Sequence, residues 1–171
     1  RLYGANVEPH LAELSHHFYR AAPGGDVDKA IDYAKRAGDR AMSLVAWEGA
    51  AANYERALQA MDLIPSPDEQ VRVDVLLALG RALNMGSADR ERWRAVFQRA
   101  AQLARRAGDS ERCARAALGF ADLFPNPGAL DAEVVRLLEE ALELLGPAES
   151  TLRARMLARL ATSCRIAVAT E

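Results

Sequence analysis

Cysteine is scarce in this chain of 171 residues. Cys113 and Cys164 are its only two, and they lie far apart, without the close spacing of a zinc or redox motif. Neither a disulfide scaffold nor a cysteine-based metal site is therefore expected, and a reducing cytoplasm is the expected location. Neither residue has a nearby histidine to activate it, so thiolate catalysis is not expected either.

The chain also lacks a dominant charge and any long apolar run. Its 22 basic and 24 acidic side chains give a formal charge of −2 and form no basic block, so we expect no nucleic-acid contact. No apolar run approaches the roughly 18 residues of a membrane span, and the amino terminus is not organised like a signal peptide. A soluble protein without a membrane partner is expected.

Apolar residues make up half of the chain and recur at spacings of three and four residues, whereas alternating β-branched runs are missing. This pattern predicts an all-α fold. Proline and glycine clusters cut the chain into about eight helices.

Some predicted helix starts have a capping mechanism. Ser66, Pro67 and Glu69 have the order of a capping box, with serine as the cap and proline at the first helical position. Asp26 and Asp131 are expected to cap the helices that follow them.

Two similar strings, AKRAGD at 34–39 and ARRAGD at 104–109, fall at different places in the predicted helices. Gly108 is expected to end a helix, with Asp109 capping the next one. Gly38 falls inside a helix, where glycine costs about 1 kcal/mol relative to alanine. We therefore expect a close approach of two helices at Gly38.

A short pattern recurs as YERAL at 54–58, FQRAA at 97–101 and LEEAL at 138–142. Taking Gly38, Gly80, Gly119 and Ala161 as equivalent gives steps of 42, 39 and 42 residues. Such periods are typical of stacked helix pairs, which mostly bind other molecules. The predicted organisation is a linker helix at 1–25 and repeats at 26–64, 66–108, 109–146 and, incomplete, 147–171.

The repeats resemble the tetratricopeptide repeat, which has Leu-Gly in its first helix and Ala, a large aromatic and Ala in its second. Leu79-Gly80 and Leu118-Gly119 match the first element, and Ala50, Tyr54 and Ala57 match the second. Trp93, Val134 and Leu138 depart from the pattern in the other copies, and the period exceeds the family's 34. The resemblance implies a tetratricopeptide-like helical-repeat solenoid, a right-handed superhelix of antiparallel helix pairs.

Residues 1–41 and 46–61 resemble a helical segment of large bacterial signal-transduction (STAND) ATPases, notably LuxR-type transcriptional regulators of the MalT kind in actinobacteria. That family has the order P-loop ATPase, helical linker, tetratricopeptide-like sensor and, often, a DNA-binding helix-turn-helix. The resemblance implies a sensor that receives a protein partner or inducer and signals to the ATPase and DNA-binding modules of its own chain. No phosphate-binding GxxxxGK[ST] loop occurs in these residues. Because residue 1 is arginine, we expect a piece of a longer polypeptide.

In tetratricopeptide arrays the first helix of each pair lines a concave wall. Placing the glycines in register predicts this wall from four groups of residues: Asp32, Lys35, Asp39 and Met42; Asp74, Leu77, Arg81 and Asn84; Phe120, Leu123 and Phe124; Arg155, Thr162 and Arg165. The change from charged to aromatic residues favours a groove for an amphipathic peptide. Alternatively, the aromatic residues pack in the core.

Two other functions remain open at this stage. A small-molecule inducer would bind inside the superhelix, with Arg81, Asn84 and Arg165 as polar contacts. A metal-dependent hydrolase would use His10, Glu13 and His17, which share a helical face, although packing at a helix end explains the same residues. The leading prediction is a non-catalytic protein-interaction domain with no cofactor, no metal and no catalytic residue.

Overall fold

The computed structural model describes residues 10–22, 25–87, 89–121 and 131–168, without the side chains of 164–168. These residues form eight α-helices and no strand, which confirms the all-α prediction. The chain divides into two compact units, Arg1–Arg92 and Trp93–Glu171. The division falls inside the predicted repeat 66–108. No described helix is long and apolar enough to cross a membrane.

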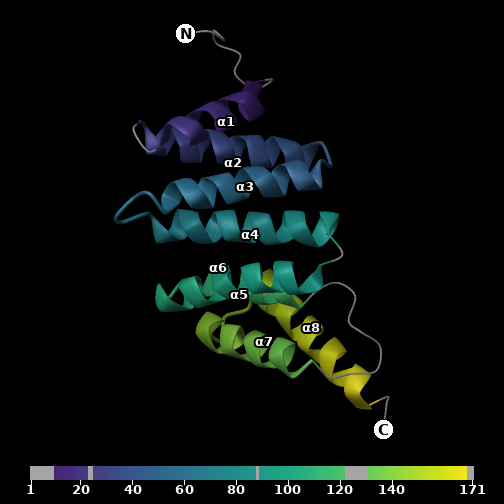
Figure 1. Cartoon of the computed structure of the whole chain (residues 1–171). Helices are drawn as coiled ribbons and strands as arrows, with labels where there is room; N and C mark the ends of the chain where they lie inside the picture. The colour runs from purple at the N-terminus through teal and green to yellow at the C-terminus, as the bar shows by residue number, and fades with distance from the viewer. Residues whose placement is uncertain (1–9, 23–24, 88, 122–130, 169–171) are drawn as a thin grey trace. The chain divides into compact units, whose positions relative to one another are not determined.

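The first unit contains α1 (Leu11–Ala21), α2 (Val27–Ser43), α3 (Trp47–Met61) and α4 (Glu69–Gly86). Each of these helices packs against the next one along the chain, and α1 also contacts α3 (Figure 1). Short turns join them, so neighbouring helices run antiparallel. The core is built from small and aliphatic side chains, which let the helices approach closely.

The second unit contains most of α5 (Arg90–Arg106), with α6 (Ser110–Phe120), α7 (Ala132–Leu145) and α8 (Thr151–Val168). Here α6, α7 and α8 all contact one another. The helices from α2 to α7 fall two by two into the predicted ranges 26–64, 66–108 and 109–146. This order is consistent with a helical repeat, while the tetratricopeptide geometry stays a prediction.

Aspartates cap five of the described helices, and one of them is Asp89, which accepts from the backbone N–H of Arg92 at the start of α5 at 3.0 Å. Asp26, Asp109 and Asp131 each accept a hydrogen bond from the backbone N–H three residues on, as predicted. The predicted capping box at Ser66 is wrong: α4 begins at Glu69, and Asp68 is its cap. Asp68 Oδ1 accepts from two backbone N–H groups, at 2.9 and 3.2 Å, so one carboxylate oxygen satisfies two otherwise unpaired donors of the first turn.

The turns after α2 and after α5 share one hydrogen-bonding pattern. The N–H of Ala46 donates to Ala41 O at 2.9 Å, and the N–H of Asp109 donates to Ala104 O at 2.9 Å. This bond closes a Schellman motif, whose penultimate residue adopts the left-handed conformation. Gly108 occupies that position after α5 with φ +69°, as predicted, but Val45 occupies it after α2 with φ +61°.

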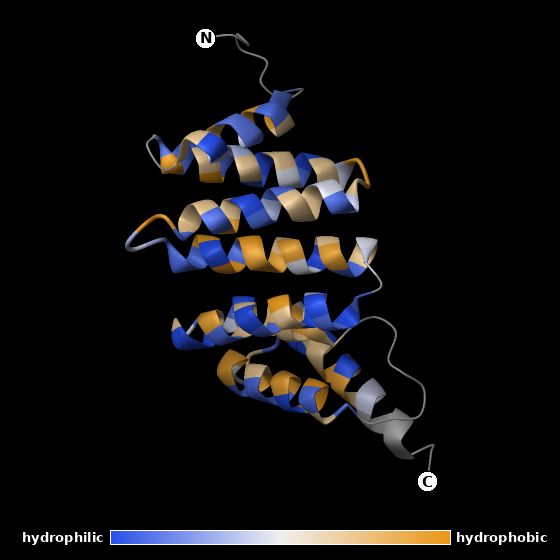
Figure 2. Cartoon of the chain, viewed as in Figure 1, coloured by the Kyte–Doolittle hydropathy of each residue, from blue (hydrophilic) through white to orange (hydrophobic). Residues whose placement is uncertain are grey.

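Val45 is unusual because a β-branched side chain disfavours positive φ. Its side chain is 63% exposed and its neighbour Leu44 is 66% exposed, so burial does not compensate the strain. The turn between α2 and α3 is accordingly one of the hydrophobic loops of the first unit (Figure 2).

Two of the repeat glycines lie under aromatic rings, which confirms the close approach expected at Gly38. A Cβ atom on Gly38 would lie 2.5 Å from the ring of Tyr54 in α3, and one on Gly119 would collide with the ring of Phe97 in α5. The partners are not equivalent, however. Tyr54 follows Gly38 within the same helix pair, whereas Phe97 precedes Gly119 and belongs to the preceding pair.

Helix α1 carries a further copy of the repeated pattern that the sequence analysis overlooked. FYRAA at 18–22 differs from FQRAA at 97–101 at one position only. Phe18 stacks on Tyr33 of α2 with ring centroids 4.9 Å apart, and Ser15 donates a buried hydrogen bond of 2.9 Å to Asn53 of α3. The predicted linker helix therefore packs as part of the first unit.

We expect Val45→Gly to stabilise the protein by about 1 kcal/mol, because glycine adopts the left-handed conformation without a steric penalty. Urea unfolding measures the change. The matched control is Gly108→Val at the same position of the other turn, with an expected loss of about 1–2 kcal/mol. A loss of stability in Val45→Gly would contradict this account of the turn.

Gly119→Ala should destabilise the protein by about 1–3 kcal/mol, because the new methyl group has no space beneath the buried ring of Phe97. Gly49→Ala is the control, since the nearest atoms to its Cβ lie 4.0 Å away. Alanine there should be neutral or stabilise by up to about 1 kcal/mol through helix propensity. Thermal unfolding measures the stability of both variants. Equal changes in stability at the two sites would argue against a close contact at Gly119.

Candidate interaction surface

Three helices of the first unit bring a tyrosine and two charged side chains together. The Tyr54 hydroxyl of α3 donates a 2.7 Å hydrogen bond to Asp39 Oδ1 of α2. Arg81 of α4 lies near enough to act electrostatically on the same phenol. Asp39 and Arg81 are exposed, whereas Tyr54 is only 2% exposed. Two residues of the predicted wall, 42 positions apart, thus both act on one buried phenol.

The environment of Tyr54 makes it a permanent hydrogen-bond donor. Burial, and then the hydrogen bond and negative charge of Asp39, raise the pKa of the Tyr54 phenol above its ordinary value, while Arg81 acts weakly in the opposite direction. The neutral hydroxyl therefore holds the Asp39 carboxylate in one place. In the sequence Tyr54 is recognised only as the aromatic position of a repeat, and a repeat pattern does not show what a hydroxyl contacts, so this positioning role was not predicted.

The other predicted wall residues of the first unit differ in exposure. Asp32 is exposed and forms an ion pair of 3.6 Å with Arg36 one turn on. Lys35, Met42, Asp74 and Asn84 are half-buried. Leu77 is buried, so its predicted place on an open wall is wrong: its side chain packs in the core.

Phe120 also belongs to the core. It is 2% exposed, and the Arg94 guanidinium carbon lies 4.2 Å from the centroid of its ring. The alternative of packing therefore describes Phe120, and its predicted role in binding is wrong because Arg94 covers the ring. Leu123 and Phe124 lie outside the described residues. A single wall from Asp32 to Arg165 stays a prediction.

The last helix, α8, contributes three predicted wall residues. Arg155 is exposed, and Thr162 is half-buried with its hydroxyl donating to Ala158 O at 2.8 Å. The side chain of Arg165 is not among those that the structure describes.

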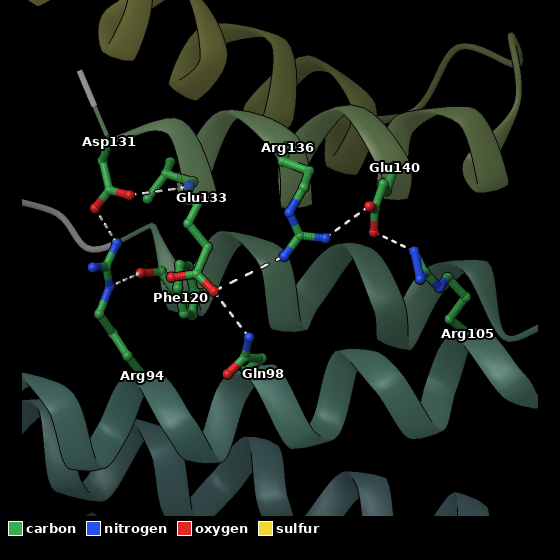
Figure 3. A network of polar contacts seen from close by, with 9 residues as sticks. Arg94, Gln98, Arg105, Phe120, Asp131, Glu133, Arg136 and Glu140 are labelled. Carbon is green, nitrogen blue, oxygen red and sulfur yellow. Dashed lines mark hydrogen bonds and ion pairs between the residues drawn. The ribbon is translucent and has the colours of Figure 1, made fainter.

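A ladder of polar contacts joins α5 to α7 in the second unit (Figure 3). At one end, Arg94 pairs with Asp131, the cap of α7. In the middle, Gln98 donates to Glu133 at 2.9 Å, and at the other end Arg105 pairs with Glu140. Partly exposed pairs of this kind contribute about 0–1 kcal/mol each, so the ladder sets the register of the helices more than it stabilises them.

A cavity of about 60 Å³ lies beside this ladder, between α5, α6 and α7. It has room for a few water molecules, and Cys113 lines it. Burial raises the pKa of the Cys113 thiol, which keeps it protonated and a poor nucleophile. The cavity thus offers neither the size of a cofactor site nor a reactive group.

Of the proposed metal ligands, His10 and Glu13 contact each other. Glu13 lies 3.5 Å from His10 Nδ1, and His17 is exposed. Among the described residues, no three His, Cys, Asp or Glu side chains are grouped to hold a metal ion. The hydrolase hypothesis finds no supporting geometry in this part of the chain.

We expect Tyr54→Phe to cost about 1 kcal/mol at neutral pH, through loss of the hydrogen bond to Asp39. The difference from the parent protein should shrink as the pH rises above about 10. There the unfolded phenol ionises while the folded one keeps its proton, so the parent loses stability that the phenylalanine variant never had. Urea titrations at pH 8 to 11 measure the stability of the parent and of the variant. If the two stabilities changed with pH in parallel, the raised pKa would be contradicted.

Comparison of this chain with protein-family models, with curated proteins and with solved structures finds no match. Inferences about function therefore depend on the residues of this chain and their contacts. Foremost among them is the cluster of Asp39, Tyr54 and Arg81 on three helices of the first unit.

Proposed function

We propose that this chain is a non-catalytic helical-repeat domain of a larger bacterial transcriptional regulator, where it binds a protein segment and passes a signal to the ATPase module of the same polypeptide. Two features of the sequence support the proposal: the repeat spacing near forty residues, and the resemblance of residues 1–41 and 46–61 to STAND regulators. Helical repeats present extended surfaces, which suit binding.

The observation that carries the proposal is the presence of opposite charges near Tyr54, of which Asp39 is held in place by the phenol. Asp39 is held by the phenol hydroxyl at 2.7 Å, so little side-chain entropy is lost when it binds a partner's cation. Arg81, also exposed, offers a guanidinium to a partner's carboxylate. Charges of both signs at one place select the orientation of a bound segment.

Exposed apolar side chains lie at the same end of the first unit. Met85, one turn beyond Arg81 in α4, is 58% exposed, and Leu44 and Val45 are 66% and 63% exposed. A Cβ atom on Gly86 would lie 2.6 Å from Trp47 Cβ, which places the end of α4 beside the start of α3 and its preceding turn. Apolar groups beside charges of both signs are typical of protein-binding surfaces.

Arg81→Glu tests this surface. Binding of the chain to the separately purified ATPase module of its parent regulator should weaken about tenfold or more by isothermal titration calorimetry, because a carboxylate then faces the partner's acidic group. Arg99→Glu, the same charge change at an exposed site of α5, should leave the affinity unchanged. Absence of binding, together with normal regulation by a parent lacking residues 1–171, would overturn the proposal.

The small-molecule alternative is separated by thermal shift. A metabolite that binds the folded chain raises its melting temperature, and the rise grows with the logarithm of the ligand concentration once this exceeds the Kd. An inducer bound at this surface should lose its effect in Arg81→Glu and keep it in Arg99→Glu. Such a result would favour inducer binding over the protein partner.

A further inference from the structure

The outward face of α8 is apolar. Ala154, Leu157, Ala158 and Ala161 are exposed and follow the spacing i, i+3, i+4, i+7, so they share one side of the helix, with Leu157 45% exposed. Met156 and Ser163, on the opposite side, are buried at 0% and 8% exposure. A surface helix normally carries polar residues on its outward face. Over residues 154–161 the outward face of α8 instead carries alanine and leucine.

The charge of α8 is of one sign. The helix Thr151–Val168 contains four arginines and no aspartate or glutamate. In contrast, α7 contains four glutamates and one arginine. A helix that lies along α8 is therefore favoured electrostatically when its own flanks are acidic.

The repeat spacing predicts a bulky apolar side chain over the apolar face. Ala161 is the fourth member of the series that begins with Gly38, Gly80 and Gly119. Aromatic rings from neighbouring helices cover Gly38 and Gly119, whereas Ala161 is exposed. At this position a bulky apolar side chain of a partner helix has a small residue to pack against.

We propose that the outward face of α8, formed by Ala154, Leu157, Ala158 and Ala161, binds an acidic amphipathic helix. The partner places leucine or aromatic side chains over the alanines and Leu157, and its glutamates lie toward the arginines of α8. This surface belongs to the second unit and does not use Asp39 or Arg81. The inference therefore stands or falls separately from the proposed function.

The probe is a fluorescein-labelled peptide with the sequence of residues 132–145, AEVVRLLEEALELL, added to the intact chain. This sequence has the required chemistry, since it combines four glutamates with an apolar side formed by Val134, Leu137, Leu138 and Ala141. We expect saturable binding by fluorescence anisotropy, weakened by salt because charges contribute. The control peptide carries lysine at each glutamate and should not bind.

Leu157→Glu identifies the surface. It should weaken peptide binding about tenfold or more, because it removes an apolar contact and adds a repelling charge. Leu63→Glu, at a leucine of similar exposure in the first unit, 49% against 45%, should bind as the parent does. Circular dichroism melts of both variants report whether each is folded.

Three results would overturn the inference. The first is absence of binding by the acidic peptide, and the second is equal binding by the lysine peptide. The third is unchanged affinity in a folded Leu157→Glu variant, which would mean that the peptide replaces α7 inside the unit. If Leu157→Glu does not fold, Ala158→Glu, which changes the same face one position on, takes its place with the same expected loss.

Discussion

Close contact between helices at small residues is the constraint on which the rest of the structure depends. The ring of Tyr54 lies directly on Gly38, and the ring of Phe97 lies directly on Gly119, so the helices approach at distances that a single methyl group would prevent. Alanines that are completely buried, such as Ala57, Ala100 and Ala141, extend these contacts along each second helix. The orientation of Asp39 depends on this contact, because the Tyr54 ring that lies on Gly38 carries the hydroxyl that donates to Asp39.

Polar contacts between alternate helices add the second level of order. Within the units they join residues 35 to 40 positions apart, close to one repeat: Ser15 with Asn53, Tyr19 with Gln59, Glu55 with Arg92, Arg94 with Asp131, Gln98 with Glu133, and Arg105 with Glu140. Helix α1 takes part through Ser15 and Tyr19 in the way that α5 does through Arg94. Packing of small residues brings helices together without choosing their register, and directional hydrogen bonds supply that choice.

The strained turn at Val45 and the apolar outer face of α8 share one property. Both are places where the packing of the described chain does not explain the residue present: one bears a backbone penalty for an exposed valine, the other exposes leucine and alanine where polar residues are usual. Local rules are broken in natural proteins mainly where function requires it.

The amino-acid sequence by itself determined the helices, three of the aspartate caps, the helix end at Gly108 and the need for a close contact at Gly38, because these depend on periodicity and on interactions within a few residues. It did not reveal the cap at Asp68, where two acceptors compete within three positions, or the helix pair to which each aromatic ring packs. Only the tertiary structure decided that Phe120 and Leu77 are buried, that Tyr54 orients Asp39 beside Arg81, and that Ala161 is exposed. The physical reason is that helical spacing says which residues share a face, but burial and charge pairing depend on which neighbouring helix that face meets.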